Sequence, residues 1–158
     1  MNLQPSLEDD LITLKPLSME HYEGLYQVAC DPLIWVQHPC SDRYKKEVFH
    51  SFFMDSILSK GALVVIEKAN VQIIGSTRFK KITNIPDAIE IGWSFLSRDK
   101  WGGQFNRSMK SLMINYAFNF FEDVLFYIGK DNIRSQKAAE KIGANRIIEP
   151  PLKYLIKW

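Results

Sequence analysis

The chain has 158 residues, of which 46% are hydrophobic and 13% aromatic, and its formal net charge is +2 at pH 7. This length fits a single domain spanning 1–158, and the hydrophobic content excludes a disordered chain. No apolar run approaches the ~20 residues of a membrane helix, and so small a net charge does not indicate a nucleic-acid surface, so we expect neither partner.

The N-terminus, the cysteines and the histidines narrow the possible classes of protein further. The N-terminus carries Glu8, Asp9 and Asp10 and lacks the basic and apolar regions of a secretory signal, so we expect a cytoplasmic protein. Cys30 and Cys40 form no CxxC motif, which indicates free thiols. The three histidines share no ligand spacing, and we predict no metal site.

The N-terminal third predicts a strand and two helices. The strand is Leu11–Leu14, and Ser18 can cap the helix that follows it. A second helix is expected to begin at Ser41 or Asp42 and to close at Gly61, since glycine suits the C-cap of a helix.

The middle of the chain predicts an antiparallel meander of three strands. The apolar run Leu63–Ile66 is typical of a strand covered on both faces, and a turn leads from it into Val71–Phe79, where Gly75 marks a bulge. The third strand alternates apolar and other residues from Ile89 to Phe95, with the carboxylate of Glu90 on its second face.

A turn containing two glycines follows and leads into a long helix. Its apolar residues from Met109 to Phe120 form a stripe at helical spacing, and Asn106 or Ser108 could cap its start. The free N–H groups at a helix start favour an anion, and four cations flank this one: Arg98, Lys100, Arg107 and Lys110. An ordinary turn with a solvated basic rim is the alternative.

The C-terminal part predicts a buried strand, a helix and an edge hairpin. The strand is Val124–Ile128, and the helix is capped by Asn132 and ended by Gly143. The hairpin is formed by Ile147-Ile148, Pro150-Pro151 and Tyr154–Ile156.

This order, β-α-α-β-β-β-α-β-α-β-β, resembles the GNAT N-acetyltransferases over nearly the whole chain. The motifs that carry the resemblance are Ile91-Gly92-Trp93, Trp101-Gly102 leading to Asn106 and Lys110, Asn132-x-x-Ser135 and Ile142-Gly143-Ala144. The connector from Leu33-Ile34-Trp35 to His38-Pro39 looks closest to the RimJ/RimL-like branch. The resemblance implies an α/β (α+β) fold, a mixed, twisted sheet of about seven strands flanked by about four helices and splayed between its fourth and fifth strands.

The resemblance also implies acetyl-CoA as cosubstrate, lying in the opening of the sheet, and a primary amine as acceptor, with a homodimer as one candidate assembly. Carried over by position, the cofactor-binding residues are Trp93, Ser94, Phe95, Arg98, Trp101, Gly102, Gly103, Gln104, Phe105, Asn106, Arg107, Lys110, Asn132 and Ser135. One departure stands out, because Gln104 replaces the central glycine of the family's Q/R-x-x-G-x-A/G turn and Asn106 its last small residue.

Acetyl transfer to an amine needs few groups, and each candidate has a structural alternative. The resemblance makes Glu90 the general base, with an ion pair to Arg78 or a neighbouring lysine as the alternative. Backbone N–H groups near Trp93 to Phe95 would hold the oxyanion, and Ser135 would protonate the departing sulfur or simply occupy the first turn of its helix.

The acceptor substrate is the part of the reaction that the sequence specifies least. Trp35 and His38 could wall its cleft, although aromatic connectors commonly pack in the core. An amine of low pKa, such as a peptide or protein N-terminus or a small amine, suits a single carboxylate base better than a lysine side chain does. Gln104 in the turn motivates a second hypothesis, a non-catalytic CoA-binding module, and the basic rim a third, a phosphate-binding regulatory domain.

Overall fold

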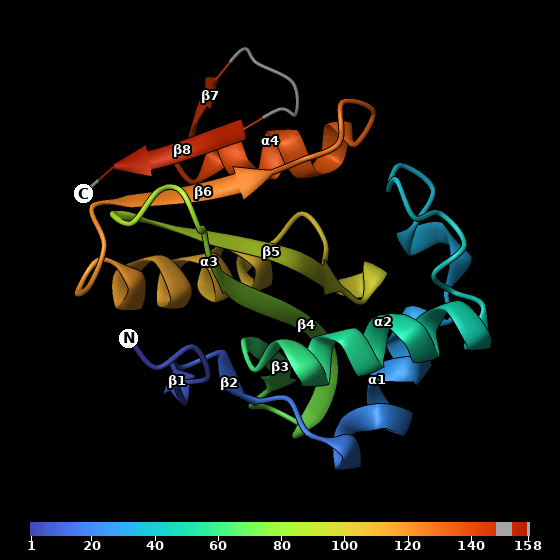
Figure 1. Ribbon diagram of the computed structural model, residues 1–158. Helices are drawn as coiled ribbons and strands as arrows, with labels where there is room; N and C mark the ends of the chain where they lie inside the picture. Colours follow the sequence, from blue (N-terminus) through green and yellow to red (C-terminus); the bar gives the residue numbers. More distant parts are fainter. Residues whose placement is uncertain (148–152, 158) are drawn as a thin grey trace.

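The computed structural model describes residues 1–147 and 153–157, and within them eight strands form one mixed, twisted sheet (Figure 1). The sheet order is β1-β2-β3-β4-β5-β6-β8-β7, and only β5 and β6 pair in parallel. The strands are β1 (Leu7–Glu8), β2 (Ile12–Pro16), β3 (Ala62–Glu67), β4 (Gln72–Lys81), β5 (Ala88–Leu96), β6 (Asp123–Tyr127), β7 (Asn145–Ile147) and β8 (Lys153–Lys157). The predicted fold class and the β3-β4-β5 meander are confirmed, with the two-residue β1 added at one edge.

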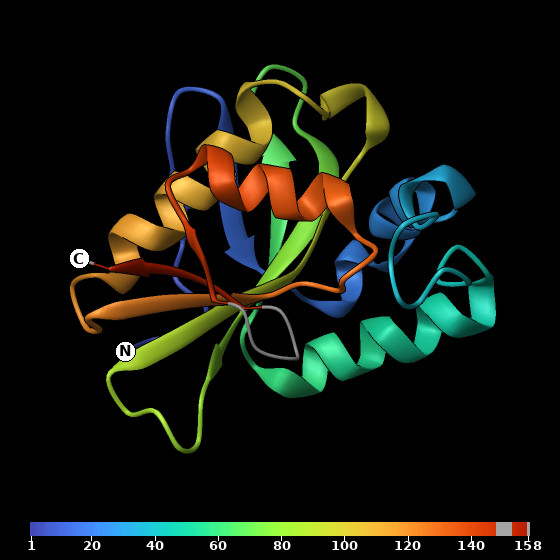
Figure 2. The same ribbon diagram turned by 90° about the horizontal axis from the view of Figure 1, so that it is seen from above.

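Four α-helices among the described residues cover the sheet. They are α1 (Tyr22–Ala29), α2 (Lys46–Ser59), α3 (Gln104–Ala117) and α4 (Ile133–Lys141). Figures 1 and 2 show α3 and α4 together on one face, and each face has its own apolar core. Met109 and Met113 of α3 pack on one side of the sheet, whereas Phe49 and Phe53 of α2 pack on the other. No helix in the described ranges is long and apolar enough to cross a bilayer.

The start of α2 differs from the prediction. Ser41 and Asp42 do not begin the helix, which starts at Lys46 with Lys45 as its N-cap. The preceding residues form turns instead, in which the Arg43 N–H donates to the Cys40 carbonyl. The Arg43 guanidinium is 4.2 Å from the Phe52 ring centroid, so this turn carries a buried cation onto the aromatic core.

Two glycines allow the backbone of a neighbouring strand to approach closely. The left-handed residue that ends α2 is Lys60, with φ of 51°, and not Gly61 as expected. A Cβ on Gly61 would lie 2.2 Å from the Phe79 carbonyl oxygen. Glycine is therefore required there because any side chain would clash with the backbone of β4. Gly75 does lie beside a bulge, because the β3–β4 register shifts next to it, and its Cβ would lie 2.0 Å from the Phe95 oxygen.

The ends of α3 also differ from the prediction. Gly103 is the N-cap, and neither Asn106 nor Ser108 caps the helix. Ser108 instead donates its hydroxyl hydrogen bond to the Asp9 carboxylate, which ties the N-terminal hairpin to α3. The helix ends at Ala117, so the exposed Phe120 lies beyond the apolar stripe assigned to it.

The C-terminal strands extend the sheet beyond β6. β8 pairs with β6 along its whole length, and β7 pairs with β8, so β7 forms the edge. The predicted hairpin residues Ile148, Pro150 and Pro151 lie outside the described residues.

The parallel pair β5 and β6 is joined only at one end. Their register runs from Ala88 opposite Asp123 to Glu90 opposite Leu125, after which β5 continues to Leu96 without a partner on that side. Figure 1 shows the two strands diverging beyond this point. The sheet is therefore open where the sequence predicted a splay.

Candidate active site

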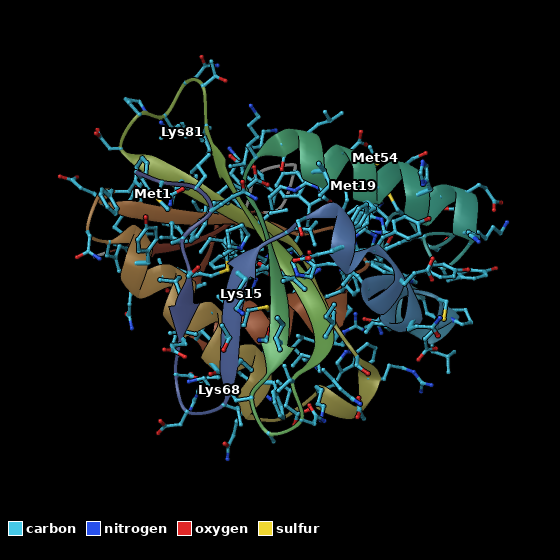
Figure 3. The ribbon with its side chains drawn as sticks, turned by 90° about the horizontal axis from the view of Figure 1, so that it is seen from below. Met1, Lys15, Met19, Met54, Lys68 and Lys81 are labelled. Carbon is cyan, nitrogen blue, oxygen red and sulfur yellow. The ribbon has the colours of Figure 1, made fainter. Side chains whose placement is uncertain are left out.

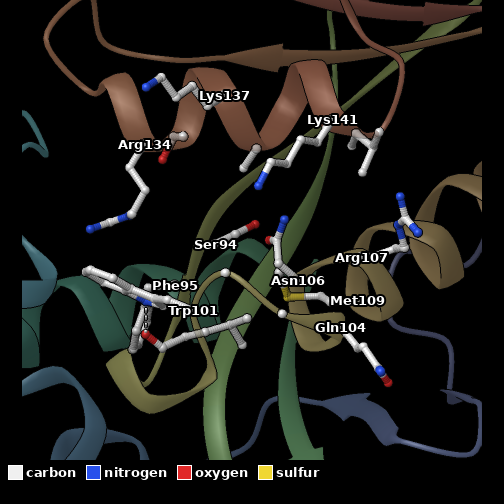
Figure 4. A pocket seen from close by; sticks show the side chains of 16 residues that line it. Ser94, Phe95, Trp101, Gln104, Asn106, Arg107, Met109, Arg134, Lys137 and Lys141 are labelled. Carbon is white, nitrogen blue, oxygen red and sulfur yellow. Dashed lines mark hydrogen bonds between the residues drawn. The ribbon is translucent and has the colours of Figure 1, made fainter.

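A cleft of about 730 Å³ lies between the start of α3 and the facing side of α4 (Figure 4). We call it the α3–α4 cleft. Its lining comes from the end of β5, the turn before α3 and both helices: Ser94, Phe95, Leu96, Trp101, Gly102, Gly103, Gln104, Asn106, Arg107, Met109, Arg134, Ser135, Lys137, Ala138, Lys141 and Ile142.

The turn presents open backbone to this cleft. Gly102 has φ of +70°, a conformation that glycine adopts without strain, and a Cβ added to Gly102 or Gly103 would meet nothing within 4 Å. Because α3 begins at Gln104, its first backbone N–H groups have no partner within the helix. The turn and the helix start therefore form a place where an anionic group can approach the main chain.

The glutamine that departs from the family turn does not obstruct the cleft. Gln104 is exposed, and in Figure 4 its side chain extends away from α4. Asn106, by contrast, points from α3 toward α4. Phe105 is turned to the core and packs under the Lys100 ammonium, 4.9 Å from its ring centroid, and does not line the cleft.

The cations of the cleft come from both helices. Arg107 is contributed by α3, whereas Arg134, Lys137 and Lys141 are contributed by α4. We did not predict the three α4 residues, although their spacing of three and four places them on one helix face. Arg98, which we did predict, forms an ion pair with Asp31 and does not line the cleft.

One end of the cleft is closed by stacking. The Arg134 guanidinium lies 3.6 Å from the Trp101 ring centroid, and its Nη2 donates to the Ile34 carbonyl at 3.1 Å. Trp101 in turn donates its Nε1–H to the Leu96 carbonyl at 2.9 Å. The first turn of α4, the turn before α3 and the connector after α1 are thereby held together.

A second cavity, of about 170 Å³, occupies the opening between β5 and β6. We call it the β5–β6 slot. It shares five lining residues with the cleft: Ser94, Asn106, Ser135, Ala138 and Ile142. Its far end is lined by His38, Pro39, Gly92 and Trp93. The cleft on one face of the sheet thus adjoins a cavity that lies between the two strands.

A bulge in β5 shapes the wall of the slot. Ser76 pairs with Phe95 and Arg78 with Gly92, which leaves Trp93 and Ser94 opposite the single residue Thr77. Trp93 has φ of 51°, a strained value for a bulky residue of the kind that concentrates at functional sites. The bulge interrupts the regular pairing of β4 with β5 beside the slot.

Lys110 lies in this slot and not on the basic rim where we expected it. Its side chain is 9% exposed, and its Nζ donates to Ser94 Oγ at 2.7 Å and lies 5.1 Å from the Phe126 ring centroid. Within the described residues no carboxylate reaches it within ion-pair distance. Burial lowers the pKa of Lys110 to about 7.

Glu90 is the last residue of β5 that pairs with β6, and it lies on the face of α1 and α2, opposite the face of the cleft. It is half-buried and lines neither cavity. Burial raises its pKa, and the nearby Lys80 and Arg78 partly oppose this. Neither cation comes within ion-pair distance, and Arg78 donates instead to Ser56 Oγ at 2.5 Å.

The other predicted residues divide between slot and core. Asn132 caps α4 by accepting the Ser135 N–H at 3.3 Å, and both residues line the slot. His38 also lines it, and burial together with Arg43 and Arg134 lowers the pKa of His38 to about 4. Trp35 is 1% exposed, donates to the Ala29 carbonyl and lines neither cavity, so it belongs to the core.

Metal ligands do not gather in the described part of the chain, where no three His, Cys, Asp or Glu side chains are grouped. The cavities instead combine cations, an open helix start and an unpaired sheet edge. Such an arrangement can hold a phosphorylated, elongated ligand and admit its far end between the strands.

Comparison with known proteins gives three findings. Residues 12–145 match the family described as acetyltransferase (GNAT) domain. No curated protein matches the chain. Many solved structures do, and one of them is an acetyltransferase (GNAT family) from Bacillus anthracis, with 15% identity, a TM-score of 0.77 and coverage of 97% of this chain and 98% of that one.

Two further structures of the same fold are informative. A protein from Vibrio cholerae provisionally named ribosomal-protein-serine acetyltransferase has 15% identity, a TM-score of 0.81 and full coverage of both chains. The Microcin C7 self immunity acetyltransferase MccE, solved in complex with acetyl-CoA and AMP, has 17% identity, a TM-score of 0.78 and 99% coverage of both chains.

Proposed function

Because the chain belongs to the GNAT acetyltransferase domain family, we propose that it transfers the acetyl group of acetyl-CoA to a primary amine by direct attack in a ternary complex. The observation that carries this proposal is that the α3–α4 cleft and the β5–β6 slot adjoin and share five lining residues. A donor bound on one face of the sheet can present its thioester to an acceptor bound on the other. We place the protein in the RimJ/RimL-like branch, in line with the Vibrio cholerae relative.

The cleft fits a CoA nucleotide by its charge and its backbone. The open turn at Gly102 and Gly103 admits a pyrophosphate to the free N–H groups of α3, and Arg107, Lys137 and Lys141 supply opposite charge. Acetyl-CoA, when bound, supplies an acetyl thioester. Asn132 would hydrogen-bond the pantetheine arm where the cleft passes into the slot.

Three groups of the chain serve the transfer itself. Backbone N–H groups at the Trp93 bulge hold the carbonyl oxygen as negative charge develops on it. Glu90 removes a proton from the amine, directly or through water, and its raised pKa makes it a better base than an exposed glutamate. Ser135 lies on the slot and would hydrogen-bond the sulfur.

The acceptor we propose is a peptide N-terminus or a small amine of low pKa. An α-amine with a pKa near 8 is about a tenth neutral at pH 7, whereas a lysine near 10.4 is neutral in about one molecule in 2,500. A single carboxylate base suits the easier deprotonation.

The test is incubation of the protein with acetyl-CoA and a panel of peptides and amines, followed by intact-mass measurement of each acceptor. We expect a gain of one acetyl group on α-amines ahead of lysine side chains. Bound CoA without acetylation of any acceptor would favour the non-catalytic CoA-binding module, and no CoA binding would overturn both.

A further inference from the structure

Lys110 is a charged side chain that the proposed reaction does not yet use. It reaches from α3 into the slot, where its one hydrogen-bond partner among the described residues is Ser94 Oγ at 2.7 Å. Ser94 Oγ is also 2.8 Å from Thr77 Oγ1, so that hydroxyl is already engaged on a second side. An ammonium has three hydrogens, and this one belongs to a buried lysine, so a ligand entering the slot meets a donor with unused capacity.

Lys110 lies where the sulfur of a bound coenzyme A would pass. Lys110 lines the slot, and its Nζ donates to Ser94 Oγ, a residue that lines both cavities, so the ammonium lies beside the region that the two cavities share. A donor whose nucleotide occupies the cleft and whose acetyl group reaches the bulge at Trp93 must pass its sulfur through this shared region. We propose that Lys110 is the catalytic acid that protonates the coenzyme A sulfur as it leaves, an inference that rests on the proposed acetyl transfer.

The proposed step balances in protons and electrons. The neutral amine attacks the thioester carbon, the C–S bond breaks, and its electron pair goes to sulfur. The Lys110 ammonium gives one proton to that sulfur, and Glu90 takes one proton from the new amide nitrogen. Solvent then returns a proton to Lys110 and removes one from Glu90, so no further reactant is required.

The acidity of Lys110 suits this role. With a pKa of about 7 it is a stronger acid than a thiol of pKa about 8.5, so the transfer runs downhill. The serine hydroxyl of Ser135 is a far weaker acid than a thiol, so it can hydrogen-bond the sulfur but is poorly suited to protonate it.

Among the described residues that line the two cavities, His38 and Tyr127 are the other candidate donors. Because His38 has a pKa of about 4, it is neutral at pH 7 and has no imidazolium proton to give. Among the described residues, the remaining charged side chains that line the cavities are the cations Arg107, Arg134, Lys137 and Lys141, and no described carboxylate lines either cavity. Of the residues facing Lys110, Ser94, Thr77 and Phe126 do not titrate near neutral pH.

The first test uses CoA alone and needs no turnover. The pKa of the bound CoA thiol is measured from the ultraviolet absorbance of its thiolate as the pH is raised. In the wild type we expect a value no lower than that of free CoA, because Lys110, with a pKa of about 7, is already neutral when the thiol titrates. Lys110→Arg, which keeps its charge over this range, should lower the thiol pKa by at least one unit relative to the wild type, whereas Lys110→Met should leave it unchanged.

The second test is kcat/KM for acetylation of an α-amine. We expect Lys110→Met and Lys110→Arg each to lose roughly 10²–10⁴-fold, the range typical of a positioned acid, since arginine keeps its proton at neutral pH. Lys15→Met, at an exposed residue of β2 (Figure 3), is the matched control and should match the wild type in both tests.

Three results would decide against Lys110. Wild-type kcat/KM in Lys110→Met excludes any role, recovery of activity in Lys110→Arg reduces the role to charge, and a thiol pKa in Lys110→Arg equal to that of the wild type denies the contact. Failure of the proposed function looks different, because the wild type itself would then acetylate no amine. The thiol titration would still test the contact of Lys110 with sulfur.

Discussion

At the scale of single residues, the role of Glu90 as a catalytic base can be told apart from a structural role. It is half-buried near Arg78 and Lys80 yet forms no ion pair with either, and burial raises its pKa. We expect Glu90→Gln to lower kcat/KM roughly 100-fold or more at neutral pH. Raising the pH should recover part of the loss, because solution then delivers neutral amine.

The measurement is the pH–rate profile of Glu90→Gln against the wild type on an α-amine and on a lysine side chain. Lys80→Met is a useful comparison, since Lys80 lies directly across the sheet from Glu90. Full activity of Glu90→Gln at neutral pH would make Glu90 a structural residue.

Lys110 should also leave a signature in the stability of the free protein. Its folded pKa of about 7 lies below its ordinary value of 10.5, so between these values the unfolded chain binds more protons than the folded one. The free energy of unfolding should therefore rise with pH above 7, by up to about 1.4 kcal/mol per pH unit. Below pH 7 both states are protonated and this dependence ends.

Urea denaturation at pH 7, 8 and 9 tests this prediction. The wild type should gain stability across the series relative to Lys110→Met, which has no buried charge to lose. Parallel curves for the two proteins would mean that Lys110 keeps an ordinary pKa in the fold.

At the scale of elements, two glycines differ in the room that surrounds them, one being in contact with a neighbouring strand and the other facing open space. A Cβ on Gly75 of β4 would lie 2.0 Å from the Phe95 oxygen of β5, whereas a Cβ on Gly103 at the start of α3 would meet nothing within 4 Å. We expect Gly75→Ala to destabilise the fold by about 1–3 kcal/mol or more through overpacking. Gly103→Ala should keep the stability of the wild type and weaken CoA binding, because its methyl group faces the cleft.

Thermal unfolding and calorimetric titration with CoA measure the two effects. The variants act as controls for each other, since both add one methyl group. Wild-type CoA affinity in Gly103→Ala would place the phosphate cradle elsewhere.

At the scale of the whole molecule, the donor site joins parts that are distant in the sequence, so its ligand should stabilise the entire fold. CoA at a hundred times its dissociation constant should raise the free energy of unfolding by about 2.7 kcal/mol. Because Arg107, Lys137 and Lys141 line an open cleft, the affinity should fall as salt rises, with a screening length of about 8 Å at physiological ionic strength.

Thermal shifts with CoA at low and high salt test this. Lys141→Ala should lose more affinity at low salt than at high salt, whereas Lys15→Met should follow the wild type. Absence of any shift at millimolar CoA, with the fold intact, contradicts a CoA site.

Much of the fold could be predicted because its signals are local. The apolar run of β3, the alternation in β5 and the stripe of α3 each follow from backbone periodicity and neighbours within a few residues. The same holds for Asn132 and Gly143, whose roles at the two ends of α4 depend only on that helix. The sequence by itself therefore determined the order of the elements, whereas the place of the splay was implied by the resemblance to the GNAT family.

Tertiary structure decided which side chains meet. Lys110 looks like a rim cation in the sequence, and it enters the slot because α3 begins at Gln104 and turns this position toward the bulge at Ser94. Helical spacing aligns Arg134, Lys137 and Lys141, but only the docking of α4 over the cleft gives their charge a ligand to meet. The physical reason is that periodicity specifies the buried face of an element, whereas packing against elements distant in the chain specifies what that face contacts.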